Sequence, residues 1–92
     1  MGNSATGEAQ RFTVESFATG ERRTVTARHW WDALADQPGP CFTVVREPGG
    51  QHAAISLEND AFTVPGEVVS ATPEAAAAAI RQRYISIRAA MA

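Results

Sequence analysis

The chain has no lysine and a single cysteine, and none of its apolar runs approaches the length of a membrane span. One cysteine, Cys41, excludes a disulfide framework within the chain. A membrane-spanning helix needs roughly 18 or more consecutive apolar residues, so no membrane partner is predicted. All eight basic residues are arginines, and alanine is abundant. This bias is typical of GC-rich coding sequences, and we therefore expect a bacterium, phage or plasmid as the source.

The remaining composition is that of an ordinary globular domain. The 92 residues carry a formal charge of -2, and 45% of them are hydrophobic. Residues 1–10 are small and polar and have no apolar core of the kind found in signal peptides. We therefore expect a disordered lead-in over 1–10, a single domain over 11–92 and a cytoplasmic location.

A short pattern occurs twice and organises the chain. The run FTV at 12–14, followed by GE at 20–21, returns as FTV at 62–64 followed by GE at 66–67. Each copy has the pattern of a strand, a glycine turn and a second strand that leads into a helix. The chain is therefore expected to pass twice over one core.

The strands are predicted from alternation and from β-branched or aromatic runs. Alternating residues favour strands at 11–18 and 22–27, and the remaining extended segments lie at 41–47, 51–58, 61–64 and 67–70. A first helix is expected over 28–36. In that helix we expect Trp31, Leu34 and Ala35 to face the core together with Ala27, and Trp30 to lie at the edge.

The last helix has the clearest start. Thr72 is a favourable N-cap, Pro73 suits the first helical position, and Glu74 suits the positive end of the helix dipole. The helix is expected to extend to about residue 90. A stripe at helical spacing should face the sheet, and it consists of Ala76, Ile80, Tyr84, Ile87 and Met91.

These elements predict an α+β domain in two layers. We expect an antiparallel sheet of four to six strands, with both helices packed on one face, in the order ββαβββ(β)α.

Candidate catalytic groups are few. Cys41 with His29 or His52 is the only conceivable nucleophile and base, and Cys41 opens an apolar strand where a free cysteine is usually a small buried hydrophobe. His29 has two aspartates nearby on the first helix, but their spacing is more typical of a solvated face than of a metal site. No phosphate-binding glycine motif is present. We therefore predict no enzyme activity, no metal and no cofactor.

A nucleic-acid-binding module is the alternative. It would use Arg22, Arg23, Arg81 and Arg88. A tail of three strands and a helix is superficially similar to a double-stranded-RNA-binding domain. The start of the last helix departs from that family, since it carries Thr72-Pro73-Glu74 instead of a lysine cluster. An acidic chain also lacks the electrostatic attraction that dominates non-specific nucleic-acid affinity.

Several residues remain as candidate contacts with a protein partner. Trp30 is a candidate anchor, because tryptophan is enriched at binding hot spots. Phe17 breaks the alternation of its strand and faces away from Phe12, so a partner is expected to cover that face. Ile85 lies about 140° from Ile80 around the last helix, among small residues. Arg81 and Arg88 share a stripe that is expected to point away from the core.

We therefore predict a small, non-catalytic protein-binding module. Its expected role is that of an inhibitor or adaptor from a phage or mobile element, such as an anti-CRISPR. The expected partner is a protein, and the last helix is a candidate homodimer contact. A cysteine-dependent enzyme is the third alternative.

Overall fold

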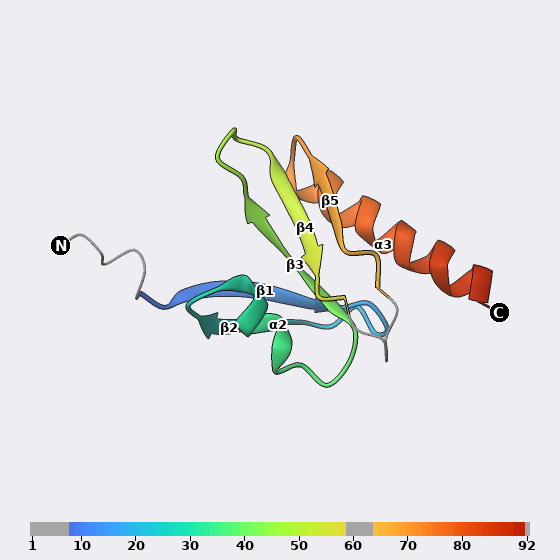
Figure 1. Cartoon of the computed structure of the whole chain (residues 1–92), viewed down its shortest axis with the longest axis horizontal. Coiled ribbons are helices and arrows are strands. Elements are labelled where there is room, and N and C mark those ends of the chain that lie inside the picture. The colour runs from blue at the N-terminus through green and yellow to red at the C-terminus, as the bar shows by residue number, and fades with distance from the viewer. Residues whose placement is uncertain (1–7, 59–63, 92) are drawn as a thin grey trace.

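The computed structural model of the chain describes residues 8–58 and 64–91. It has an antiparallel five-stranded sheet in the order β2-β1-β3-β4-β5, with two helices packed against it (Figure 1). The elements are β1 (Gln10–Ser16), β2 (Arg22–Ala27), α2 (Trp30–Ala35), β3 (Cys41–Arg46), β4 (His52–Ser56), β5 (Glu67–Ser70) and α3 (Pro73–Met91). The predicted α+β class, antiparallel sheet and order of elements are confirmed. Most of the strand expected at 61–64 lies outside the described residues.

β1 and β2 form a hairpin, and β1 pairs with β2 over a longer stretch than with β3. The hairpin pairs six residues of each strand, from Gln10 opposite Ala27 to Glu15 opposite Arg22. Gly20 closes the turn at φ 76°, a left-handed conformation that glycine adopts without strain. On its other side, β1 pairs with β3 over only three positions, which end at Val14 opposite Thr43. The sheet is therefore joined at one end of these two strands and open at the other.

β3 is buried on both faces, and the two helices consequently lie on opposite faces. Cys41 packs in a cluster with Leu34 of α2, whereas its neighbour Phe42 packs in a cluster with Ile80 of α3. Successive side chains of a strand point to opposite faces of its sheet. The prediction that both helices share one face is therefore wrong. The sequence does contain an indication of this arrangement. The strand around Phe42 and Val44 has consecutive apolar residues, whereas strict alternation is expected only when one face of the sheet is solvated.

α2 is short and buries a different side from the one expected. Ala33 and Leu34 are buried, and Trp30 packs against the same cluster from its half-buried position. Trp31 is 46% exposed, so the predicted inward position of Trp31 is wrong. Positions 30, 33 and 34 have the i, i+3, i+4 spacing of one helix face, as position 31 with 34 and 35 also has. The spacing alone therefore does not decide which of the two helix faces is buried.

α3 begins as predicted. The Thr72 hydroxyl accepts a hydrogen bond from the backbone N–H of Ala75 at 3.1 Å, which is an N-cap. Ala76 and Ile80 are fully buried against the sheet, and Tyr84 is half-buried. Met91 is 59% exposed although it lies on the same stripe, which corrects its predicted contact with the sheet. Within the described ranges, no helix has both the length and the apolar character that a membrane crossing requires.

Two isoleucines on α3 provide a matched test of this packing. Ile80 is fully buried and Ile85 is 58% exposed. We expect Ile80→Ala to lower the free energy of unfolding by about 2–4 kcal/mol, because it leaves a cavity between helix and sheet. Ile85→Ala should change it by less than about 0.5 kcal/mol. Urea denaturation of both variants measures the difference, and equal losses would contradict the burial described here.

Candidate functional site

A buried carboxylate joins three elements on the α3 face of the sheet. Glu15 of β1 is 8% exposed. Arg81 of α3 donates two hydrogen bonds to it, from Nε to Oε2 at 2.6 Å and from Nη2 to Oε1 at 2.9 Å. Arg22 of β2 donates a third from Nε to Oε1 at 3.1 Å. A bidentate guanidinium fixes the relative orientation of its two elements as well as their distance.

The protonation of Glu15 reflects this environment. Hydrogen bonding from Arg81 lowers the pKa of Glu15 below its ordinary value of 4.5, with burial acting in the opposite direction and Arg22 adding to the lowering. Glu15 is therefore ionised at neutral pH in the folded protein. Glu15 was not among the residues expected to form a site.

An aromatic stack lies next to the ion pair. The ring of Phe17 stacks on Tyr84 of α3 with centroids 4.4 Å apart, and it contacts the tilted ring of Phe42 of β3 with centroids 5.0 Å apart. The guanidinium of Arg88 lies over the ring of Tyr84, and that of Arg81 lies over Phe42. The predicted orientation of Phe17, away from Phe12, is correct, but α3 of the same chain covers it. Phe17 is therefore part of the internal packing of the domain.

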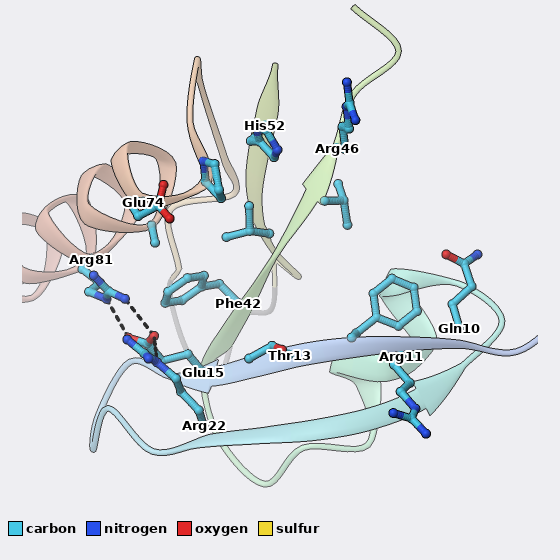
Figure 2. Close-up of a pocket in the computed structure, with 15 residues that line it drawn as sticks. Gln10, Arg11, Thr13, Glu15, Arg22, Phe42, Arg46, His52, Glu74 and Arg81 are labelled. Carbon is cyan, nitrogen blue, oxygen red and sulfur yellow. Dashed lines mark hydrogen bonds and ion pairs between the residues drawn. The ribbon is translucent and has the colours of Figure 1, made fainter. Parts of the chain in front are cut away.

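A cleft of about 680 Å³ opens beside Glu15, between α3 and the separated ends of β1 and β3 (Figure 2). Its apolar surface includes Phe42, Val44 and Ala77. Clefts of about 300–1,000 Å³ are typical of ligand sites. The polar lining residues are Gln10, Arg11, Thr13, Glu15, Arg22, Arg46, His52, Glu74 and Arg81.

The arginines of the cleft fall into two classes. Arg22 and Arg81 are held by Glu15, whereas Arg11 and Arg46 form no ion pair with any described residue. Arg11 and Arg46 stand on the two strands that border the opening (Figure 2). Nδ1 of His52, which lies opposite Arg46 in the sheet, is buried without a hydrogen-bond partner among the described residues. The open end of the cleft therefore contains uncompensated polar groups.

Four large apolar side chains outside the cleft are exposed. Ile85 and Met91 on α3 are 58% and 59% exposed, and Trp31 and Val69 are 46% and 45% exposed. Trp31 stacks on His29 with ring centroids 4.3 Å apart, and the edge of Trp30 meets it. The exposed tryptophan is thus Trp31, whereas the predicted anchor Trp30 packs against the core.

The predicted contact residues do not form one surface. Phe17 and Arg81 belong to the packing between α3 and the sheet, whereas Arg88 is exposed and lies over Tyr84. Trp30 is on the opposite face, and Ile85 points outward. Arg81 is therefore not on an outward stripe as predicted, since it turns to Glu15. The sequence analysis missed Arg11 and Arg46 as a pair. Each is a charged residue in a predicted strand. Only the strand register, which is not known from the sequence, places both on the same face of the sheet.

The geometry gives little support to a catalytic cysteine. Burial raises the pKa of Cys41 to about 11, against a smaller opposing effect of the nearby charge of Arg23. Cys41 and His52 lie on opposite faces of the sheet and at opposite ends of β3, and His29 is stacked on Trp31. Across residues 8–58 and 64–91, no group of three or more His, Cys, Asp or Glu side chains is arranged to hold a metal.

We expect Glu15→Gln to lower the free energy of unfolding by about 1–3 kcal/mol, because it removes a hydrogen-bonded buried charge. Because folding lowers the pKa of Glu15, its ionised form stabilises the fold above pH 4.5, and this contribution is lost as pH falls through the folded-state value. The difference between wild type and variant should thus be constant from pH 7 to 5 and shrink below 4.5.

Glu21→Gln is the matched control, because the Glu21 to Arg23 ion pair is exposed on both sides. Its effect should stay below about 0.5 kcal/mol. Urea denaturation at several pH values measures both variants. A loss that is independent of pH, or equal for the two glutamates, would refute a special role of Glu15.

Cys41 should react slowly with a disulfide reagent at pH 8. Only about one thiol in a thousand is ionised at that pH when the pKa is about 11. We expect labelling of the native protein to be at least a hundredfold slower than labelling in 6 M guanidinium. Fast stoichiometric labelling of the native protein would instead support the cysteine-dependent alternative.

Comparison with known proteins adds no further constraint. No family model matches the chain, and no curated protein or solved structure shows significant similarity to it. Two surfaces of the domain remain as candidate binding sites, the exposed end of α3 and the cleft between β1 and β3.

Proposed function

We propose that the domain is a protein-binding module and that its contact surface is the outer side and free end of α3. The observation that carries this proposal is the length of α3. Its 19 residues span about 28 Å, whereas the five residues of β4 span about 17 Å. The last turns of the helix therefore project past the strands (Figure 1). They carry Ile85 and Met91, the two most exposed large apolar side chains of the described residues.

The outer side of α3 supports the same proposal. Five exposed positions of α3 follow one another at alternating spacings of three and four residues, and none of them is charged. They are Ala75, Ala78, Gln82, Ile85 and Ala89. This is the spacing of a seam between packed helices, and alanine allows close approach. A second copy of the chain would present the same stripe, so a symmetric homodimer is one form of this contact.

The proposed role is that of an inhibitor or adaptor that acts by occupying a partner's surface. A phage or mobile-element origin, with anti-CRISPR activity as one example, remains a prediction from size and composition. Action in the cytoplasm is part of the proposal, and the free thiol of Cys41 suits a reducing compartment. The raised pKa of that thiol is consistent with a non-catalytic role.

The nucleic-acid alternative loses support from the arginine contacts. Arg22 and Arg81 are paired with Glu15, and Arg23 is paired with Glu21. Arg88 lies over Tyr84. Binding phosphates with Arg22 or Arg81 would compete with their ion pairs to the buried carboxylate of Glu15.

Ile85→Arg tests the proposal. It places a charge in the apolar stripe at an exposed position, so the fold should be retained. We expect wild type to self-associate in sedimentation equilibrium, or else to retain a stoichiometric partner from extracts of the native host. In either assay Ile85→Arg should weaken association at least tenfold.

Trp31→Arg is the matched control, because Trp31 is also an exposed apolar side chain but lies on α2. It should leave association unchanged. Association that is lost only in Trp31→Arg would move the contact surface to α2 and overturn the assignment to α3. The proposed function would be overturned if the wild-type protein is monomeric and retains no partner whose binding is weakened by Ile85→Arg.

A further inference from the structure

The two strand edges that face the cleft have unpaired backbone groups. The N–H of Phe17 donates to the carbonyl of Pro40 at 3.0 Å, which sets the alternation of the β1–β3 ladder. Odd-numbered residues of β1 therefore turn their N–H and C=O toward β3, and even-numbered residues of β3 turn theirs toward β1. The hydroxyl of Thr43 donates to the carbonyl of Thr13 at 2.7 Å, where the pairing stops.

The register shows which groups are left over. Continued past Val14 and Thr43, it would pair Arg11 with Arg46, but the strands diverge before that point (Figure 2). The backbone N–H and C=O of Arg11 and Arg46 thus face the opening, and no ladder among the described residues uses them. β2 and β4 already occupy the other sides of β1 and β3. The cleft is therefore an internal pair of free strand edges.

Free edges of this kind accept an extended peptide by strand addition. A peptide offers both N–H donors and C=O acceptors, which match both kinds of backbone group. A phosphate only accepts hydrogen bonds, so it would leave the carbonyls of Arg11 and Arg46 unpaired. The cleft volume of about 680 Å³ is large enough for a short segment.

The charges specify the side chains of that peptide. Arg11 and Arg46 have no carboxylate partner among the described residues, whereas Glu74 is the one lining carboxylate besides the paired Glu15. Nδ1 of His52 adds a buried polar atom without a partner beside Arg46. An acidic side chain would neutralise the arginines, and bidentate pairing of a carboxylate with arginine is strong and directional.

We propose that the cleft between β1 and β3 binds a short extended segment of a partner protein that carries Asp or Glu. Its backbone pairs with the free edges at Arg11 and Arg46, and its carboxylate pairs with one of these arginines. This is a second surface, so the proposal stands or falls separately from the α3 contact, and Ile85→Arg should leave peptide affinity unchanged.

Selection of random seven-residue peptides displayed on phage against the full chain tests the proposal. We expect enrichment of proline-free sequences with Asp or Glu. A synthetic copy of a selected peptide should bind Arg46→Glu and Arg11→Glu at least tenfold more weakly. Arg83→Glu is the control with the same charge change, on an exposed part of α3 outside the cleft, and it should bind as wild type does. All three variants should keep the wild-type melting temperature, because the three side chains are exposed.

Two further measurements separate strand addition from a simple charge effect. N-methylation of alternate peptide residues should abolish binding, because it removes backbone donors and leaves the charge unchanged. Selection against Arg46→Glu should enrich Lys or Arg in place of acidic residues. Recovery of no binder, or of binders indifferent to Arg11 and Arg46, would overturn the proposal. Binding of a random DNA duplex that depends on the same two arginines would overturn it in favour of nucleic acid.

Discussion

The ion pair between Glu15 and Arg81 is the constraint on which the arrangement of the two surfaces depends. α3 packs mainly over β3, β4 and β5, and Glu15 links it to the hairpin of β1 and β2. The carboxylate lies opposite Phe42, within the last paired positions between β1 and β3. It therefore holds α3 at the closed end of the cleft. The Phe17–Tyr84 stack supports the same junction from the side of the turn.

The cleft exists because the face of the sheet that α3 covers is apolar on β3 and β4 but polar on β1. On β3 and β4 that face carries Phe42, Val44 and Ala54, which α3 buries. On β1 it carries Arg11 and Thr13, which are exposed. A helix gains little from covering charged and hydroxyl side chains. The part of the sheet that α3 covers consequently ends at Glu15 on β1, and β1 and β3 diverge beyond it.

The sequence predicted what local chemistry determines. The start of α3 at Thr72 and the burial of Ile80 follow from a cap and a helical spacing within a few residues. Glu15 and Arg81 are 66 residues apart, and no local pattern marks them as partners. The choice between Trp30 and Trp31, and the placement of the helices on opposite faces, likewise depend on which strands are neighbours. Such contacts come from the order β2-β1-β3-β4-β5, which the order along the chain did not predict.

The two proposed surfaces use different physics and lie on neighbouring sides of one helix. The outer stripe around Ile85 presents small and apolar side chains, which favour packing against another helix. The inner side presents Ala77 and Arg81 to a cleft lined by polar backbone and arginines. A ligand in the cleft would contact β1 and β3 and would leave Ile85 free. If both proposed contacts form, the domain would hold two partners at once, which is the arrangement that an adaptor requires.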